Sequence, residues 1–387
     1  MIKKRKIAVI TGARAEYGIL KPLLEGIKKS GDFKLELLAG GMHLLEKYGL
    51  TIREIEKDGF KISGKVKMYS GNIKNPLYYG KALGEGIKNF SKALLKIKPD
   101  IAAVFGDRLE PLAATLAAAA LRLPIVHIHA GDKTDDGHID EAITRSITRF
   151  SHLHFAPTEK CKARLIKMGE EPWRVYNVGA LNIDSVLSEP KIKKEILFKK
   201  FNLEVSQKFI LCLFHPVNLE IEKTREIMRK IVNALAELKI QTVIIYPNND
   251  AGSGAIIKEI EKARNLPFVR VFPNLLHKEY LNLLRYADVL VGNSSSGVIE
   301  APAMKLPVVN IGLRNVGREH AENIIFIEAD RTKIVKAIKK ALYDRTFKEK
   351  VKKCTNPYGN GGTSGRIVKI LRKMKVDKKL LHKKITY

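Results

Sequence analysis

The sequence is poor in cysteine and has no long apolar run. Its three cysteines, Cys161, Cys212 and Cys354, are scattered and form no CxxC pair, which argues against a zinc or disulfide framework and for a reducing, cytoplasmic location. The longest apolar run, around 113–120, is alanine-rich and short of the roughly 18 residues that a membrane span needs. The apolar part of the start "MIKKRKIAVITG" is too short for a secretory leader, so it predicts a buried first strand.

Acidic residues are fewer than basic ones, with 41 Asp and Glu against 70 Lys and Arg, and the formal net charge is +29. Such an excess is typical of nucleic-acid-binding proteins. The lysines, however, are spread along the chain, and the sequence has no basic cluster with interleaved aromatics, no zinc finger and no RNA-binding signature. We therefore expect no nucleic-acid and no membrane partner. The basic segment 371–387 is predicted to be a packed terminal helix with a solvated lysine face.

Short β-branched runs alternate with helical patterns along the whole chain. Near-continuous apolar strands separated by helices are typical of a parallel sheet covered on both faces. A charged stretch at 188–207 interrupts the pattern, which then restarts. We predict an α/β protein of two Rossmann-like, doubly wound domains, residues 1–187 and 208–370, joined by this crossing. Ligand chemistry is expected where the strand ends of both halves face a shared cleft.

The expected strand ends of the second domain carry donors for an anion. In "GNSSSGVIEAP" at 292–302, three hydroxyls open an expected helix, whose N–H groups and positive end suit a phosphate. The carboxylate about one turn later suits the two hydroxyls of a ribose. A histidine in "FHPVN" and an arginine in "NIGLRNVGR" add further donors. The set predicts a nucleotide-diphosphate site of Ser294, Ser295, Ser296, Glu300, His215 and one of the two arginines Arg314 and Arg318.

A basic turn follows the first expected strand. In "TGARAEYG" at 11–18, small residues such as Ala15 let the backbone approach a ligand, and Arg14 offers a guanidinium fork to phosphate. The turn does not match the GxGxxG fingerprint, so a dinucleotide cofactor is not indicated.

Carboxylates follow two further strands of the first domain. Asp107 and Arg108 come directly after a buried strand, Asp132 follows the next strand, and Asp140 starts the helix after it. Carboxylates brought together at strand ends can have their pKa values pushed apart, giving one acid and one base. The other acids of the stretch 129–145 are explained by the positive end of a helix; they are Asp135, Asp136 and Glu141.

A metal site is the alternative for this acidic region. His127 and His129 are two apart on one expected strand and, with Asp107 and Asp132, would make a set of two histidines and two aspartates. The sequence has no second HxH and no HExxH, and strand histidines are commonly buried and hydrogen-bonded. We therefore expect no metal.

Eight motifs, in order across nearly the whole chain, resemble the hydrolysing UDP-N-acetylglucosamine 2-epimerases of sialic-acid-type sugar biosynthesis. The resemblance implies a glycosyltransferase-B-like pair of Rossmann domains, no metal or redox cofactor, and a homodimer. The motifs are "TGARAEYG", "GDRLEPLAA", "HIHAGD" with "IDE" and "IT", "SHLHFAPTE", "RVYNVGALNID", "FHPVNLE", "YPNNDAGS" and "GNSSSGVIEAPAMKLPVVNIGLRNVGR".

The resemblance also implies a reaction. A base removes the C2 proton of the sugar while the C1–oxygen bond breaks, which expels UDP and leaves a 2-acetamidoglucal. Water then adds across the double bond and gives free N-acetylmannosamine. By motif, the catalytic set is Asp107, Asp132 and Asp140, and the nucleotide positions are Arg14, Arg108, His215, Asn248, Ser294, Ser295, Ser296, Glu300 and Arg314.

The chain departs from the family pattern in two places beside the sugar. It reads "AGD" where the family usually has "GGE", so Asp132 is one methylene shorter than the expected glutamate. It reads "ITRSIT" for "IRHAIT", so Thr144 and Arg145 replace arginine and histidine. These two residues are candidates for sugar specificity.

Three other functions stay open. The non-hydrolysing relatives share the fold and nucleotide site, but tend to carry "EAGLRT" and "HRREN" where this chain has "HAGDKT" and "FHPVN". A glycosyltransferase would use the same cleft on an acceptor, which leaves the acids without a purpose. A catalytically silent nucleotide-sugar sensor is suggested by the two departures.

Overall fold

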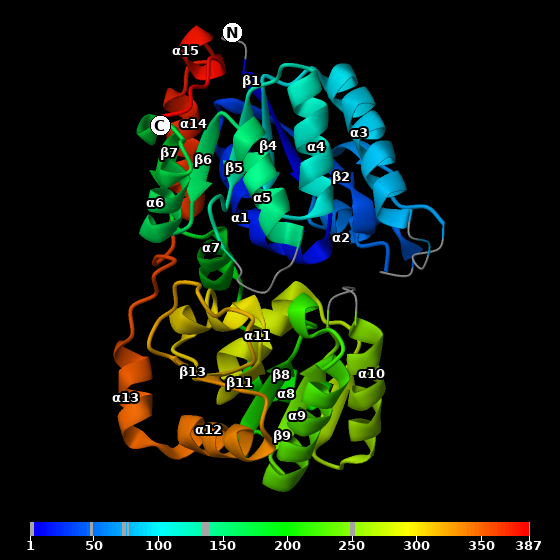
Figure 1. Cartoon of the computed structure of the whole chain (residues 1–387), viewed down its shortest axis with the longest axis vertical. Coiled ribbons are helices and arrows are strands. Elements are labelled where there is room, and N and C mark those ends of the chain that lie inside the picture. The colour runs from blue at the N-terminus through cyan, green and yellow to red at the C-terminus, as the bar shows by residue number, and fades with distance from the viewer. Residues whose placement is uncertain are drawn as a thin grey trace. The chain divides into compact units, whose positions relative to one another are not determined.

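The chain folds as two α/β units. The computed structural model describes residues 4–46, 49–71, 75, 77–133, 139–247 and 252–386. By their internal contacts, the first unit comprises Met1–Asp132, Ile139–Ser185 and Gly359–Tyr387, and the second comprises Lys133–His138 and Val186–Tyr358. Each has a parallel sheet with helices on both faces (Figure 1), which confirms the predicted fold class.

Seven parallel strands form the sheet of the first unit. They are β1 (Arg5–Thr11), β2 (Phe33–Gly40), β3 (Ile62–Val66), β4 (Ile101–Phe105), β5 (Ile125–Ile128), β6 (Leu153–Ala156) and β7 (Val175–Asn177). Their order is β3-β2-β1-β4-β5-β6-β7. The winding direction reverses between β1 and β4, and such reversals are where α/β sheets place ligands, beyond the carboxyl ends of the strands.

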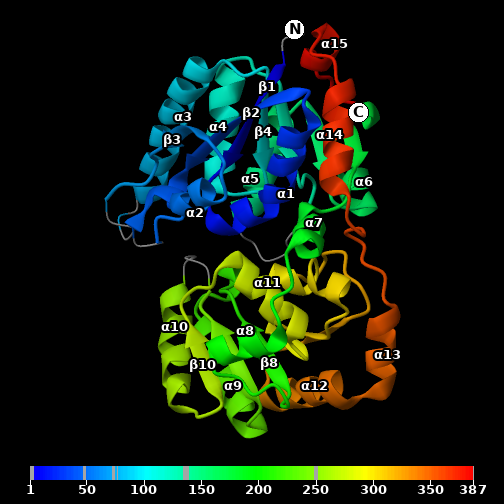
Figure 2. The same cartoon turned by 180° about the vertical axis from the view of Figure 1, so that it is seen from behind.

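Helices cover both faces of this sheet. The first unit contains α1 (Arg14–Ser30), α2 (Ile52–Lys57), α3 (Tyr78–Ile97), α4 (Leu109–Ala120), α5 (Ile139–Phe150), α6 (Glu159–Lys167), α14 (Thr363–Lys373) and α15 (Lys378–Leu381), and α7 (Leu181–Ser188) crosses the boundary. Helices α1 and α14 lie on one face (Figure 2), and α3, α4 and α5 lie on the other (Figure 1). Alternate residues of β1 therefore enter two separate apolar clusters, Ile7 and Val9 on the α1 side and Ala8 and Ile10 on the α4 side.

The second unit repeats the scheme with six parallel strands in the order β10-β9-β8-β11-β12-β13. The strands are β8 (Phe209–Leu213), β9 (Gln241–Ile245), β10 (Val269–Phe272), β11 (Val289–Gly292), β12 (Val308–Ile311) and β13 (Ile324–Ile327). The helices are α8 (Lys194–Phe201), α9 (Thr224–Leu238), α10 (Ser253–Lys262), α11 (His277–Tyr286), α12 (Arg331–Tyr343) and α13 (Arg345–Lys353). Here the winding reverses between β8 and β11.

The unit boundaries differ from the predicted ones at two places. Residues 188–207 are not only a crossing, because they contain α8, whose Phe198 is buried in the core of the second unit. The chain from Gly359 belongs to the first unit, although 359–370 was predicted to belong to the second domain. The reason is packing: Ile367 and Leu371 of α14 are buried in the cluster beneath α1, and Arg5 Nη2 donates to the carbonyl of Leu371 at 2.7 Å.

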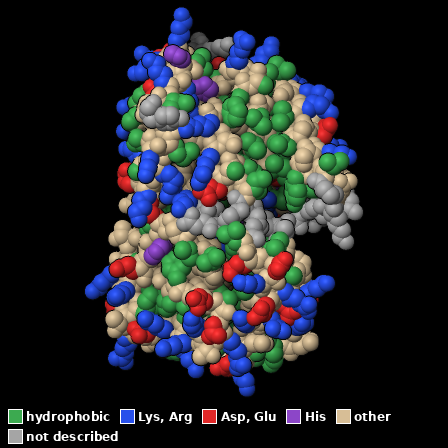
Figure 3. Space-filling view, in the orientation of Figure 1, with side chains coloured by type: hydrophobic (Ala, Val, Ile, Leu, Met, Phe, Trp, Pro, Cys, Tyr) green, Lys and Arg blue, Asp and Glu red, His purple; other side chains and the backbone are tan. Residues whose placement is uncertain are grey.

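Over the described residues, no helix is both long and apolar enough to cross a membrane. On the face shown in Figure 3, Lys and Arg side chains are scattered over both units and interspersed with acidic and apolar ones. The basic terminal segment 371–387 contains the end of α14 and the short α15, whose Leu380 is buried while the neighbouring lysines are exposed. A packed terminal segment with a solvated lysine face was predicted, and it forms two short helices instead of one.

Candidate active site

Asp107 and Asp132 lie at the carboxyl ends of neighbouring strands. Strands β4 and β5 pair in parallel with Phe105 opposite Ile128, and the next peptide, Gly106, donates its N–H to the carbonyl of Ile128 at 3.0 Å. Asp107 follows this bond directly and is partly buried. The two carboxylates thus leave adjacent strands at the same edge of the sheet, as the sequence predicted.

A left-handed residue turns the chain after β5. His129 has φ of +64° and its ring lies 5.6 Å from that of Phe105, centroid to centroid. Its Nε2 is 3.4 Å from Oδ2 of Asp132, whose side chain is 11% exposed. The turn therefore folds Asp132 back against the histidine, which is in a position to orient this carboxylate.

Helix α5 carries the third predicted acid and both specificity candidates. Asp140 lies in its first turn and is partly exposed. Thr144 is buried, whereas Arg145 is exposed and pairs with Glu141 one turn earlier. Of the two residues that depart from the family, Thr144 is thus the one enclosed by protein. Asp135 and Asp136 lie outside the described residues.

The alternative metal set is wrong, because His127 has both ring nitrogens occupied. Its Nε2 lies 2.9 Å from the carbonyl oxygen of Gly106, and its Nδ1 lies 3.2 Å from Oγ1 of Thr148. A carbonyl only accepts, so Nε2 carries the proton and Nδ1 accepts from the threonine hydroxyl. Burial lowers the pKa of His127 to about 3, which keeps the ring neutral. His127 is therefore a bridge between the end of β4 and α5.

A buried carboxyl pair that the sequence analysis did not identify lies at the reversal between β1 and β4. Glu110 of α4 is fully buried and accepts from the Tyr69 hydroxyl at 3.0 Å, and Glu16 of α1 accepts from the N–H of Gly12 at 3.3 Å. Burial, and next the charge of Glu110, raise the pKa of Glu16 well above its usual range. Burial beside a second carboxylate therefore favours the protonated form of Glu16.

Glycines make room for this pair. A Cβ at Gly12 would lie 2.5 Å from Cβ of Glu110, and one at Gly41 would lie 2.5 Å from its Cγ. A side chain at either position would displace the buried carboxylate. Gly12, one of the small residues of "TGARAEYG", therefore makes room for a side chain of the protein itself.

The predicted basic residues surround the same reversal. Arg108, which precedes α4, has its Nε 3.8 Å from Oε2 of Glu110. Arg14 begins α1 and is partly buried, and its charge acts on Glu54. Ala15 is exposed in the first turn of α1. The guanidinium groups of Arg14 and Arg108 thus belong to the two loops that follow β1 and β4.

In the second unit, the serine-rich segment begins a tandem of short 3₁₀ turns. Ser295–Gly297 forms one turn and Ala301–Met304 forms the next, where the sequence predicted one helix. Ser294 accepts from the N–H of Ser296 at 3.3 Å as an N-cap. The N–H groups of Ile299 and Glu300 donate to carbonyls four residues earlier, so the part between the two turns has the hydrogen-bond pattern of an α-helix.

Buried polar groups line this segment. Ser294, Ser296 and Glu300 are all buried, and Ser295 is partly buried. Burial, and next the charge of Glu300, raise the pKa of Tyr280, which the sequence analysis did not select. A buried carboxylate one turn after a hydroxyl cluster fits the predicted ribose and phosphate contacts.

Asparagines fix the backbone around His215. Asn293 Oδ1 accepts from the N–H of His215 at 2.7 Å, and Asn293 Nδ2 donates to its carbonyl at 2.9 Å. Asn315 Nδ2 donates to the carbonyl of Asn293 and to Oδ1 of Asn310, each at 3.0 Å. This network joins the ends of β8, β11 and β12, and none of its asparagines was selected from the sequence.

His215 is itself buried beside a cation. Burial, and next the charge of Arg314, hold the pKa of His215 well below its usual range. A neutral ring with one N–H is a directional donor, and Arg314 supplies the positive charge. The structure thus brings two of the predicted nucleotide-binding residues together. Asn248, another of them, lies outside the described residues.

The comparisons with known proteins agree with this arrangement. A family model described as UDP-N-acetylglucosamine 2-epimerase matches residues 25–372. A UDP-N,N'-diacetylbacillosamine 2-epimerase (hydrolyzing) of Legionella pneumophila is 33% identical over 379 residues, which cover 98% of each protein. A GDP/UDP-N,N'-diacetylbacillosamine 2-epimerase (hydrolyzing) of Campylobacter jejuni is 34% identical over 84% of each.

Solved structures share the fold along nearly the whole chain. The UDP-GlcNAc 2-epimerase of Neisseria meningitidis, bound to UDP-GlcNAc, matches with a TM-score of 0.81 at 22% identity and covers 95% of this chain and 100% of its own. The enzyme of Methanocaldococcus jannaschii, in complex with UDP-GlcNAc and UDP, gives 0.79 at 23% identity, with 95% and 100% covered. Since the family model and the Legionella relative both span most of the sequence, the chain belongs to the UDP-N-acetylglucosamine 2-epimerase family.

Proposed function

We propose that the protein is a hydrolysing 2-epimerase that converts UDP-N-acetylglucosamine, or a close UDP-acylamino sugar, into UDP and a free N-acetylmannosamine-type sugar. The observation that carries this proposal is the similarity to the Legionella enzyme, hydrolysing by name, over 98% of both chains. The carboxylates after β4 and β5 and the donors after β8 and β11 supply the two kinds of group that such a reaction needs.

The first step is an elimination. A carboxylate takes the proton from C2, the C–H electrons form the C1=C2 bond, and the C1–oxygen bond breaks with its electron pair leaving on UDP. The product is a 2-acetamidoglucal. We assign the base and the acid to the set Asp107, Asp132 and Asp140, which lie after β4, after β5 and at the start of α5.

The second step is addition of water. Hydroxide from water adds to C1 and a proton adds to C2 on the face opposite to the one that lost it, so C2 is inverted. A second carboxyl of the same set donates this proton, which requires two carboxyls in opposite protonation states. The contact between His129 and Asp132 supports a role for Asp132 in one of the two transfers.

Binding of the nucleotide is assigned mainly to the second unit. The hydroxyls and N–H groups of Ser294, Ser295 and Ser296 suit the diphosphate, and Glu300 suits the ribose hydroxyls. His215 and Arg314 stabilise the charge that develops on the departing UDP. Arg14, Ala15, Arg108 and Asn248 complete the proposed set of nucleotide contacts.

The proposal also covers which acylamino sugar the enzyme accepts. The Legionella and Campylobacter relatives act, by name, on N,N'-diacetylbacillosamine nucleotides. We propose that Thr144 and Arg145 help to choose between such a 6-deoxy diamino sugar and N-acetylglucosamine. Thr144 has the stronger support, because it is buried whereas Arg145 is engaged with Glu141 on the helix surface.

Product analysis tests the reaction. The protein is incubated separately with UDP-N-acetylglucosamine and with UDP-N,N'-diacetylbacillosamine, and UDP and sugars are quantified by chromatography. The proposal predicts UDP and a free manno-configured sugar in equal amounts from at least one of them. An interconverting pair of UDP-sugars would indicate a non-hydrolysing enzyme. Release of UDP only when an acceptor is added would indicate a glycosyltransferase, and binding without turnover would indicate a sensor.

We also propose a cytoplasmic homodimer. All three cysteines are buried thiols, which suits a reducing compartment. Apolar side chains gather on the face that carries α3, α4 and α5 (Figure 3). Leu95 of α3 is 57% exposed, and Ile139 and Phe150 of α5 are 65% and 44% exposed. A second copy of the chain is the proposed cover. Light scattering should give twice the chain mass of 43.4 kDa, and a monomer for Phe150→Glu; a wild-type monomer would contradict this.

A further inference from the structure

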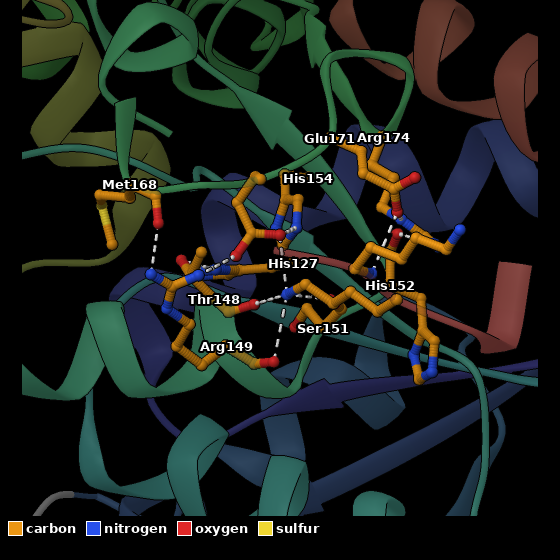
Figure 4. Close-up of polar contacts among 12 residues, drawn as sticks. His127, Thr148, Arg149, Ser151, His152, His154, Met168, Glu171 and Arg174 are labelled. Atoms are coloured by element: carbon orange, nitrogen blue, oxygen red, sulfur yellow. Dashed lines mark hydrogen bonds and ion pairs between the residues drawn. The ribbon is translucent and has the colours of Figure 1, made fainter. Parts of the chain in front are cut away.

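The end of the chain is fastened to the first unit by a buried arginine. Arg174, at 0% exposure, donates to the carbonyls of Leu380 at 2.7 Å, of Lys379 at 3.0 Å and of His382 at 3.0 Å. Its Nε also bonds Oε2 of Glu171 at 2.6 Å (Figure 4). The backbone of residues 379–382 is thereby held in place, and the side chain of the next residue, Lys383, is largely buried.

Lys383 caps the end of helix α5. Its Nζ lies 2.8 Å from the carbonyl oxygen of Thr148, 3.1 Å from that of Arg149 and 2.9 Å from that of Ser151. The carbonyls of Thr148 and Arg149 belong to the last turn of α5 and that of Ser151 follows the helix, so the ammonium opposes the negative end of the helix. Figure 4 shows the three residues converging on one point. The tail thus supplies a charged partner to the end of this helix, in addition to the bond that the carbonyl of Thr148 accepts from the N–H of Ser151.

A buried ion pair holds the ammonium in this place. Glu170, at 0% side-chain exposure, lies 2.7 Å from Lys383 Nζ and accepts from His154 Nε2 at 2.9 Å. Arg149 Nη1 binds the other oxygen of Glu170 at 3.2 Å. The Lys383 side chain is 15% exposed, so its charge is enclosed together with its partners. Removing one member of such a network leaves the others buried without their counter-charge.

The last turn of α5, whose carbonyls bind Lys383, also contacts the end of β4. Thr148, whose carbonyl binds Lys383, donates its hydroxyl to His127 Nδ1, and His127 Nε2 donates to the carbonyl of Gly106. Gly106 directly precedes Asp107. The other end of α5 carries Asp140. One connected set of contacts thus runs from the C-terminal tail to both elements on which these two acids lie.

We propose that Lys383 is a positioning residue for catalysis, acting through the last turn of α5 and His127 to hold Asp107 and Asp140 in their working places. This inference rests on the proposed function for the roles of the two acids. It needs no contact between Lys383 and substrate. A displacement of about 1 Å at a reacting group can cost roughly a hundredfold in rate, so loosening the helix should slow turnover.

The test compares Lys383→Met with Lys384→Met as a matched control, since Lys384 is the exposed neighbour in the same tail. Lys383→Met keeps the apolar stem and removes the ammonium. We expect kcat to fall about ten- to hundredfold, with UDP affinity within twofold of wild type, because most of the proposed nucleotide-binding residues lie in the second unit. Lys383→Arg, which keeps a cation with several donors, should restore most of the rate, and Lys384→Met should behave as wild type.

Hydrogen exchange followed by mass spectrometry provides a readout that needs no substrate. Lys383→Met should speed amide exchange in peptides that cover 139–151 and 100–108, and Lys384→Met should not. Thr148→Val leaves the tail in place and breaks the contact with His127, so it should slow turnover and speed exchange at 100–108 only. This second variant covers the case in which Lys383→Met does not fold.

The outcomes separate this inference from the proposed function. Unchanged kcat and unchanged exchange in Lys383→Met would overturn the inference. So would a parallel loss of kcat, UDP affinity and melting temperature, since that pattern indicates general unfolding. If wild type releases no UDP from either sugar nucleotide, the proposed function fails, and the exchange data alone then decide whether Lys383 holds α5 and the end of β4.

Discussion

The side chain of Asn293 holds the backbone of His215 from both sides, accepting from its N–H at 2.7 Å and donating to its carbonyl at 2.9 Å. The two residues belong to the loops after β11 and β8, so this pair of bonds ties together the strand ends at the reversal in the second unit. The backbone that carries the buried histidine ring is thereby fixed.

Asn293→Ala should weaken UDP binding. The substitution removes both bonds from Asn293 to the backbone of His215. Leaving a buried polar group without its hydrogen bond costs about 1–3 kcal/mol of stability. We expect the dissociation constant for UDP, measured by calorimetry, to rise about tenfold or more. Asn282→Ala is the control: Asn282 is equally buried in the same unit but binds the backbone near residue 190. UDP affinity equal in the two variants would contradict the role of Asn293.

Asp107→Asn should abolish turnover and leave UDP binding intact. An amide cannot take or give the C2 proton, whereas most of the nucleotide contacts are assigned to the second unit. The rate of UDP release should fall by about a thousandfold or more. Asp100→Asn is a control at the opposite end of the same strand, where Asp100 accepts from the N–H of Lys6 at 2.7 Å. Residual activity of Asp107→Asn near the control's would remove Asp107 from the catalytic set.

Glu16→Gln should stabilise the protein at high pH more than at low pH. The pKa of Glu16 is raised in the folded state by burial and then by the charge of Glu110. As pH rises above the ordinary carboxyl pKa, the unfolded chain releases a proton that the folded chain keeps, so wild type loses stability. The neutral variant escapes this loss. Urea unfolding at pH 4 and pH 8 measures the difference, and Glu25→Gln, on the exposed side of α1, is the control.

If Glu16→Gln increased the free energy of unfolding more at pH 4 than at pH 8, this result would contradict the raised pKa of Glu16. The variant keeps an oxygen acceptor for the N–H of Gly12, so loss of that bond does not confuse the comparison.

His127→Gln should make stability less sensitive to acid. Burial lowers the pKa of His127 to about 3. Below an ordinary histidine pKa of about 6.5, the unfolded chain therefore binds a proton at this residue that the folded chain does not bind. Wild type then loses about 1.4 kcal/mol per pH unit from this group as pH falls toward 3. The variant is less stable at pH 7, because glutamine cannot satisfy both Gly106 and Thr148 as the ring does, but its unfolding free energy should fall less between pH 6.5 and pH 4.

Chemical unfolding followed by circular dichroism gives this slope. His320→Gln serves as control, because His320 is exposed and its Nδ1 contacts only the neighbouring carbonyl of Ala321 among the described residues. An acid sensitivity of His127→Gln equal to that of wild type would show that this ring does titrate in the folded protein.

The fold and the strand-end residues were predictable because both follow from local patterns. Apolar runs separated by amphipathic segments specify a parallel sheet, and a polar residue directly after such a run must lie at its carboxyl edge. Asp107 and His215 were found in this way. The same reasoning placed Asp132, which lies beside His129 after β5.

The contacts that organise these residues were not predictable, because they join distant segments. Glu110 looked like an ordinary acid in the first turn of a helix, yet it fills the space beside Gly12 and Gly41. The segment after Gly359 follows the second unit in sequence, and only packing against α1 returns it to the first. Lys383 is one lysine in a basic tail, and its burial depends on Arg174, about two hundred residues earlier.

The 3₁₀ turns after β11 show a different limit. Ser294 and its neighbours predicted a helix by their capping pattern, and the cap is present. Pro302, which lies at the start of the second turn, cannot donate an N–H, and a tight turn accommodates it where a continuous helix would lose a bond. The cap at Ser294 was therefore predicted correctly, while the continuous helix was not, and the role of the serines as phosphate donors remains a proposal.

Turnover in D2O is the most direct test of the proposed reaction. The protein is incubated with UDP-N-acetylglucosamine and, separately, with UDP-N,N'-diacetylbacillosamine, and the products are analysed by NMR and mass spectrometry. Elimination followed by addition of water predicts one deuterium at C2 of a free manno-configured sugar, with one UDP released for each. A free sugar that keeps its C2 hydrogen, or deuterium found only in intact UDP-sugars, would contradict it.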